Sequence, residues 1–301
     1  MAVDSNWSSV ALLLPMTDDT NDVKGHTITA YGGATLSSAA GTPFGSGNSL
    51  FLDGVNDYLT TPDSVDFTVG SGDFTIEAWV NFVAHTTDVS IVGQRVTGGS
   101  NHSMSLEYIN TGSAGFRWSY TTDGVTVINV DRAWTPTNGV WYHLSVIRTT
   151  TIVKFKVNGV QLGADYTIGS STIYDSSALL YVGAINATPG GFFSGYIGPL
   201  RFTKYARTIT AAPTAPFPRP TISGTVYDSV GAKASKVVVA IKRSNMTLAG
   251  QALSDGTLGT YTIYPSDFSE HIVAEFDTAT YPLVDGGSGE NALIYDRVIP
   301  G

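Results

Sequence analysis

Glu77 and Glu107 are the only glutamates in the first 210 residues of the chain. Hydrolysis of a glycosidic bond with retention needs two carboxyl groups about 5 Å apart, which Glu residues at even spacing on one strand would supply. These two are thirty residues apart, and the pattern E-x-D-x-x-E does not occur in the chain. Glu270 and Glu275 are five apart, which puts them on opposite faces of a continuous strand. We therefore predict no glycoside hydrolase site.

The sequence also lacks the patterns of cysteine, serine and zinc enzymes. The chain has no cysteine, which excludes a thiolate nucleophile, a thiolate metal site and a disulfide. There is no G-x-S-x-G elbow, and the five histidines lack the H-E-x-x-H spacing of a zinc site. His143, which follows two aromatic residues in an apolar run, is predicted to be a core histidine. The sequence predicts a protein that is not an enzyme.

A group of aromatic and polar residues is suited to sugar binding. A rigid ring covers the C–H face of a sugar, while polar side chains bond its hydroxyls. Such residues flank a loop-rich stretch at 121–131. The candidate carbohydrate-binding residues are Trp118, Tyr120, Asn129, Arg132 and Trp134. In contrast, Trp79 and Trp141 lie in apolar runs and are predicted to be in the core.

Three oxygen-bearing side chains stand close together at residues 53–57. Asp53, Asn56 and Asp57 could bind Ca²⁺, which prefers oxygen ligands on loops. Asp and Asn also stabilise turns by accepting hydrogen bonds from their own backbone. Both the metal site and the turn are therefore consistent with the sequence.

The charge of the chain excludes some partners. The net charge is −9, and Lys and Arg form no cluster in either half of the chain. Binding to nucleic acid or to an anionic membrane needs a basic surface, so we expect neither. The apolar run from Val10 to Leu14 is too short for a signal-peptide core or a membrane span, which favours synthesis in a cytoplasm.

Alternation of apolar and polar residues, together with turn-forming residues, predicts an all-β chain. Residues 73–82 place five apolar side chains on one face of a strand: Phe74, Ile76, Ala78, Val80 and Phe82. Residues 154–162 predict a hairpin around Asn158 and Gly159, with Lys154 and Lys156 facing water. Further strands are expected at 141–147, 178–182, 222–227, 237–241, 261–264 and 271–276.

A proline-rich segment divides the chain. Residues 211–220 read AAPTAPFPRP, and four prolines in ten residues favour an extended connector. We predict a first domain at 1–210, a linker at 211–220 and a smaller β-sandwich at 221–301. A domain of about 80 residues is marginal by itself, so it is expected to pack on another surface.

The first domain resembles a known fold family over nearly its whole length. The segments WSSVALLLPM, SLFLDGVNDYL, DFTIEAWV, GVWYH, KVNGVQLG and GYIGPLRFTKY follow the order of the laminin G-like, concanavalin A-like jelly-roll family. The resemblance implies an antiparallel jelly-roll sandwich that binds carbohydrate or protein at its loop rims, in some members with Ca²⁺. The family also includes glucanases, which the missing carboxylate pair disfavours here.

The sequences at the two ends of this domain, WSSVALLLPM and YIGPLRFTKYAR, look like those of tailed-bacteriophage virion proteins. The C-terminal segment ISGTVYDSVGAKASKVVVAIKR resembles carboxypeptidase-regulatory-like or immunoglobulin-like modules. The resemblance implies a virion surface protein, either a tail-fibre and receptor-binding component or a capsid decoration protein. Its partners would be other virion proteins and a host-surface glycan, in a homo-oligomer or symmetric multi-copy assembly. A carbohydrate-binding adhesin module is the alternative.

Overall fold

The computed structural model describes residues 4–96, 101–112, 114–185, 191–226, 232–265, 271–276, 293–298 and 300. The chain divides into two compact units, one of residues 9–217 and one of residues 1–8 with 218–301. Strands dominate both units, which confirms the all-β prediction. Among the described residues, the helices η1 (Trp7–Ser9) and η2 (Val65–Phe67) are single 3-10 turns, and none is long and apolar enough to cross a bilayer.

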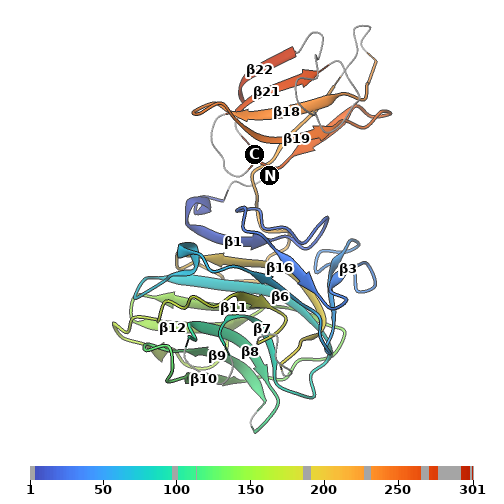
Figure 1. The fold of residues 1–301 in the computed structure, drawn as a ribbon. Coiled ribbons are helices and arrows are strands. Elements are labelled where there is room, and N and C mark those ends of the chain that lie inside the picture. The colour runs from blue at the N-terminus through green and yellow to red at the C-terminus, as the bar shows by residue number, and fades with distance from the viewer. Residues whose placement is uncertain are drawn as a thin grey trace. The chain divides into compact units, whose positions relative to one another are not determined.

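The larger unit contains a nine-stranded sheet (Figure 1). Its strands are β1 (Val10–Leu14), β3 (Thr35–Ser37), β4 (Ser49–Asp53), β6 (Phe74–Ala84), β11 (Trp141–Thr149), β12 (Ile152–Val157), β13 (Val160–Gln161), β14 (Tyr166–Thr167) and β16 (Ser194–Thr203). The order is β13-β12-β11-β6-β16-β4-β3, with β1 paired to β16 and β14 paired to β12.

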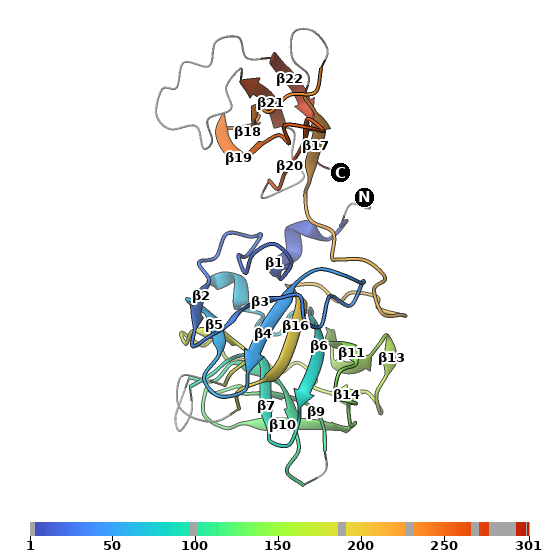
Figure 2. The same ribbon diagram turned by 90° about the vertical axis from the view of Figure 1, so that its right-hand side faces the viewer.

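A seven-stranded sheet forms the second layer of this unit (Figure 2). Its strands are β2 (Thr29–Tyr31), β5 (Tyr58–Thr61), β7 (Val89–Gln94), β8 (Met104–Ile109), β9 (Gly115–Tyr120), β10 (Ile128–Ala133) and β15 (Leu180–Val182). The order is β10-β9-β8-β7-β15-β5-β2. Residues 121–131 are predicted to be loop-rich, and the structure corrects this for residues 128–131, because they lie in β10 and pair with β9.

The core lies between the two sheets, and alternation along the strands fills it. All five apolar residues predicted to share one face of β6 are in the core cluster. They meet inward-facing side chains of the seven-stranded sheet, such as Leu106, Phe116 and Trp118. The antiparallel sandwich predicted from the sequence is therefore confirmed.

The hairpin between β12 and β13 turns at Asn158 and Gly159, as predicted. Their φ angles are 52° and 80°, the positive values that a type I′ turn requires. Phe155 points into the core. Lys156 does not face water as expected, because it is half-buried and its Nζ donates a hydrogen bond to the carbonyl of Ile209.

A buried charge network joins three strands on the outer face of the nine-stranded sheet. Glu77 on β6 accepts hydrogen bonds from Arg201 on β16, with Oε1 at 2.9 Å from Nε and 2.7 Å from Nη2. Its Oε2 lies 3.0 Å from Nε2 of His143 on β11. Burial would raise the pKa of the Glu77 carboxyl, but His143 and Arg201 outweigh it, and the pKa lies below its usual value.

Residues just after β16 cover this network. The guanidinium of Arg201 lies 4.2 Å from the ring centroid of Phe217, and His143 contacts the same ring edge-on. The backbone of Ala211 lies against Gly159, where no Cβ would fit. The outer face of the nine-stranded sheet is therefore covered, around Glu77, by the chain's own segment from Ile209 to Phe217.

The smaller unit is a β-sandwich. Its strands are β17 (Ile222–Thr225), β18 (Val237–Lys242), β19 (Thr247–Leu253), β20 (Thr260–Ile263), β21 (His271–Phe276) and β22 (Leu293–Val298). β17 pairs with β20, and the other four form a sheet of order β19-β18-β21-β22. Ile222, Val238, Ile263 and Val273 come from both sheets and share one core.

Replacing Glu77 with Gln is expected to lower the free energy of unfolding by about 3 kcal/mol at pH 7, because the buried ion pair between Glu77 and Arg201 is broken. Since the folded pKa of Glu77 is depressed, its contribution is complete above the unfolded pKa of about 4.3 and is lost at lower pH. The difference in unfolding free energy between wild type and Glu77→Gln, measured by urea denaturation, should shrink as the pH falls below about 4.

The control is Asp165→Asn, because Asp165 is exposed and lies 3.9 Å from Lys154. This variant should match wild-type stability within about 0.5 kcal/mol. A Glu77→Gln protein as stable as Asp165→Asn would contradict a structural role for the network.

Candidate functional site

The outer face of the seven-stranded sheet gathers polar and aromatic side chains. Val130, Trp118 and Leu106 are opposite one another in the register and point into the core, so their chain neighbours point outward. One line of register partners runs Asp131, Arg117, Glu107 and Ser90, across β10, β9, β8 and β7. We call these four residues the charged row.

Charges of opposite sign alternate in the charged row. Arg117 donates two hydrogen bonds to Asp131, from Nε to Oδ1 at 2.6 Å and from Nη2 to Oδ2 at 2.8 Å. These bonds raise the pKa of the Arg117 guanidinium further. Glu107 accepts a hydrogen bond of 2.9 Å from Nη1 of Arg95, which follows β7. Each carboxylate of the row is therefore paired with one guanidinium.

Serine hydroxyls complete the shell around Glu107. Ser105 Oγ donates to Glu107 Oε1 at 2.6 Å and lies 2.7 Å from Ser119 Oγ. Ser105 and Ser119 are themselves register partners in a second row, which continues to Asn129 on one side and Gly93 on the other. This hydrogen bonding fixes the position of Glu107.

Aromatic rings occupy the β2 end of the same face. Tyr31 on β2 stacks on Tyr58 of β5, with centroids 4.7 Å apart and planes 9° apart. Tyr58 also contacts Tyr181 of β15 and Phe192. Tyr31 is 41% exposed, whereas Tyr58 and Tyr181 are buried below it. We call these four residues the aromatic cluster.

Gly93 lies between the polar and aromatic parts of the face. It is the register partner of Ser105 on one side and Tyr181 on the other. A Cβ on Gly93 would lie 2.5 Å from the Cβ of Ser105, so a side chain does not fit there. Glycine in a strand interior often marks a place where another group approaches the backbone closely.

His102 precedes β8 and is buried, and neither of its ring nitrogens is hydrogen-bonded to a residue that the structure describes. Burial, and secondly the charge of Arg95, lower its pKa from 6.5 to about 4. The imidazole is therefore neutral at pH 7 and adds no positive charge to this region.

Two of the predicted sugar-binding aromatics are in the core. Trp118 is 0% and Tyr120 is 2% exposed, and their rings stack on each other with centroids 4.5 Å apart. The Tyr120 hydroxyl lies 2.9 Å from that of Tyr166. Neither ring can meet a sugar, and this prediction is corrected. The physical reason is that Trp118 and Tyr120 share the inward face of β9 with Phe116, at every second position of the strand.

The other three predicted sugar-binding residues are separated. Arg132 points inward, where its Nη2 donates to the carbonyl of Ala164 and its guanidinium lies 4.9 Å from the ring centroid of Phe155. Trp134 packs against the core and contacts Tyr142 edge-on. Only Asn129 is exposed on the outer face, next to Ser119.

The three predicted calcium ligands form a turn. Asp57 is buried and accepts hydrogen bonds from the backbone N–H groups of Gly33 and, at 3.0 Å, Asp53. Asp53 accepts from the N–H of Val55 at 2.8 Å. Asn56 is exposed. In the part of the chain that the structure describes, no three Asp, Glu or His residues are placed to hold a metal ion.

Glu77 and Glu107 lie on opposite faces of the sandwich. Glu77 is on the outer face of the nine-stranded sheet and Glu107 on that of the seven-stranded sheet, so the core separates them. Sheets in a sandwich stack about 10 Å apart. These two carboxylates cannot act on one glycosidic bond.

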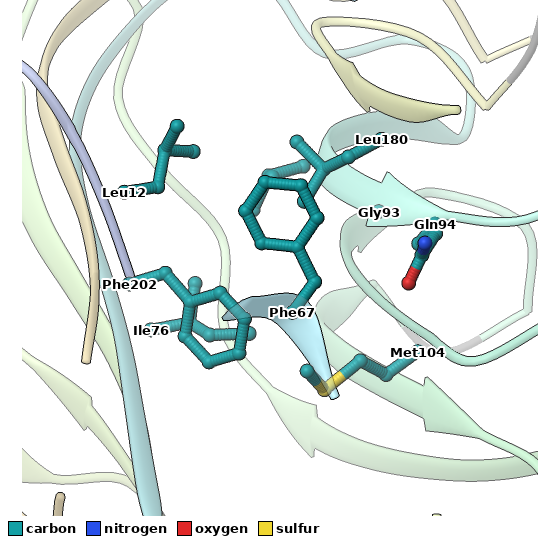
Figure 3. Close-up of a pocket in the computed structure, with 9 residues that line it drawn as sticks. Leu12, Phe67, Ile76, Gly93, Gln94, Met104, Leu180 and Phe202 are labelled. Atoms are coloured by element: carbon teal, nitrogen blue, oxygen red, sulfur yellow. The ribbon is translucent and has the colours of Figure 1, made fainter. Parts of the chain in front are cut away.

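A cavity of about 20 Å³ lies between the sheets, beside η2 (Figure 3). Its walls include Phe67 of η2, Phe202 of the nine-stranded sheet and Met104 of the seven-stranded sheet. This volume holds about one water molecule. The cavity is a packing gap and is too small for a sugar.

A family model described as the concanavalin A-like lectin/glucanases superfamily matches residues 53–211. No curated protein sequence matches the chain. Domain 4 of a GH43 extracellular arabinanase from Geobacillus stearothermophilus, solved with arabinotriose, has a TM-score of 0.51 and 20% identity, covering 67% of this chain and 97% of that one.

Two toxin domains are also similar. The botulinum neurotoxin serotype D binding domain has a TM-score of 0.54 at 10% identity, covering 92% of this chain and 74% of that chain. The binding domain of Paraclostridial Mosquitocidal Protein 1 has a TM-score of 0.53 at 9% identity, covering 91% and 85%. At such identities the likeness shows the shared fold.

Replacing Asp57 with Asn is expected to lower the free energy of unfolding by about 1–3 kcal/mol, because a charged acceptor of two backbone N–H groups is lost. The loss should be the same in EDTA and in excess Ca²⁺, as measured by thermal unfolding. If Ca²⁺ raises the melting temperature of the wild type and not of Asp57→Asn, the turn is a calcium site after all.

Proposed function

Because the chain belongs to the concanavalin A-like lectin/glucanases superfamily, we propose that it is a binding module and that the outer face of its seven-stranded sheet recognises a glycan. The observation that carries this proposal is that one face carries an exposed ring, Tyr31, at its β2 edge and two exposed polar side chains, Asn129 and Asp131, at its β10 edge. The two edges are six strands apart, about 29 Å, so the ligand would be an extended oligosaccharide that lies across the strands. Aromatic faces and hydrogen-bonding groups are the chemistry that such a ligand needs.

A binding role fits the rigidity of this face. Tyr58 stacks on the Tyr31 ring and is itself in contact with Tyr181, and a ring held in place loses little conformational entropy when a ligand binds. The two fold relatives named as toxin binding domains, and the arabinanase domain solved with arabinotriose, support recognition as the role of this module.

We propose no catalytic activity. The two glutamates of the larger unit lie on opposite faces, and each is tied into its own hydrogen-bond network. Glu107 and Asp131 share a face but are two strands apart, which is about 10 Å, with Arg117 between them. Pairs that hydrolyse glycosidic bonds lie about 5–9.5 Å apart around the sugar.

We further propose that the chain serves on the surface of a bacteriophage particle, with the larger unit turned to the host glycan and the smaller one attached to other virion proteins. The support is the resemblance of residues 7–16 and 196–207 to virion proteins. Several copies in a symmetric assembly would raise the avidity of a weak glycan site.

Replacing Tyr31 with Ala is expected to weaken glycan binding about tenfold, since the loss of one stacking face costs on the order of 1.4 kcal/mol. A glycan array identifies the oligosaccharide, and titration calorimetry measures the affinity. Tyr31→Phe keeps the ring and should keep most of the affinity. Tyr205 is 46% exposed and follows β16 of the other sheet, so Tyr205→Ala is the matched control and should bind as the wild type does.

If no glycan on the array binds, or if Tyr31→Ala binds as well as Tyr205→Ala, the outer face is not a glycan site. The bound oligosaccharides should also remain intact on long incubation. Cleavage that Glu107→Gln abolishes would contradict the assignment as a binding module.

The particle role is tested by cryo-EM of purified particles of the phage that encodes the chain. We expect density that fits both units at symmetry-related positions. Density on the capsid lattice would identify a decoration protein, and a few copies at the tail would identify a receptor-binding component. Absence of the chain from the particles would contradict the virion role and favour the adhesin module.

A further inference from the structure

We propose that this face selects uncharged glycans and rejects those that carry carboxylate or sulfate groups, an inference that rests on the proposed function. It follows from the positions of the positive charges on the seven-stranded sheet. Every guanidinium that the sheet carries is already bound within the protein.

The sequence supplies few cations to this sheet. There is no Lys or Arg between Lys24 and Arg95, and none between Lys156 and Arg201. Strands β2, β5, β7 and β15, and the chain that follows β15, therefore contribute no positive side chain to the face. The remaining strands and their connections add two arginines to Arg95, at positions 117 and 132.

Each of these three arginines has its partner. Arg95 is bound to Glu107 at 2.9 Å, and Arg117 is bound to both carboxylate oxygens of Asp131. Arg132 points inward to backbone carbonyls and the Phe155 ring. An acidic sugar that approached the face would have to displace a carboxylate from its guanidinium to gain a counter-charge.

An anion would also meet repulsion. Asp131 is 46% exposed and carries its negative charge on the open side of the charged row. Moving an anion out of water without a counter-charge is costly, and a like charge nearby raises that cost. His102 gives no help, because its imidazole is neutral at pH 7.

Neutral hydroxyls meet no such penalty. The amide of Asn129 and the carboxylate of Asp131 can accept hydrogen bonds from sugar hydroxyls, and the Asn129 amide can also donate. Tyr31 lies six strands away, about 29 Å, so its ring covers the apolar side of another unit of the same extended oligosaccharide. The face is thus suited to hexose or pentose units without acidic substituents.

Replacing Asp131 with Asn tests the inference, because it releases Arg117 on the open side of the face. An array of neutral oligosaccharides, each paired with its sialylated or sulfated counterpart, is the probe. The wild type should bind the neutral member of each pair only. Asp131→Asn should gain about tenfold or more in affinity for the acidic member, and the gain should fall as salt is added. Asp165→Asn removes a similarly exposed carboxylate elsewhere and should gain nothing.

The outcomes separate the inference from the function on which it rests. If the wild type binds acidic glycans as well as neutral ones, the selectivity is wrong while the glycan site stands. If Asp131→Asn gains no affinity for the acidic glycans, Asp131 is not the residue that rejects them and the inference fails. If the wild type binds no glycan at all, both the proposed function and the inference fail.

Discussion

The buried carboxylate of Glu77 is the constraint on which the larger unit depends. It stands in the middle of a sheet strand, out of water, and is stable there only because Arg201 and His143 come from the two neighbouring strands. A charge so placed requires β6, β11 and β16 to keep one register, since a slip by one residue would move every partner to the other face. The aromatic ring of Phe217 then keeps water from the network.

This arrangement gives the two outer faces of the sandwich different roles. On the nine-stranded sheet the charges serve the fold, and the chain's own segment covers them. On the seven-stranded sheet the charges are equally well paired, yet Tyr31, Asp131 and Asn129 remain in contact with solvent. The buried charges of the first face stabilise the structure, whereas the second face leaves polar and aromatic side chains exposed to solvent.

The strands could be predicted where the evidence is local. Alternation in β6 and the Asn-Gly turn after β12 depend on neighbours in sequence, and both were predicted correctly. The sugar-binding residues were predicted from residue type alone, and the alternation of Phe116, Trp118 and Tyr120 would have indicated burial instead. The aromatic cluster could not be predicted, because Tyr31, Tyr58 and Tyr181 meet only through the strand order β2-β5-β15. Likewise β19 lacks the β-branched residues that mark a strand, apart from Thr247.

The contact of Phe217 with the Glu77 network determines where the boundary of the larger unit lies. A boundary drawn where the composition changes, at residue 210, would leave the Phe217 ring and the Ala211 contact on the wrong side of the cut. Ala211 contacts Gly159 and Phe217 covers Arg201, so residues 211–217 belong to the larger unit. Recombination between genes would therefore transfer this domain intact only if the crossover lies beyond Phe217. A crossover before Phe217 would leave the Glu77 network uncovered.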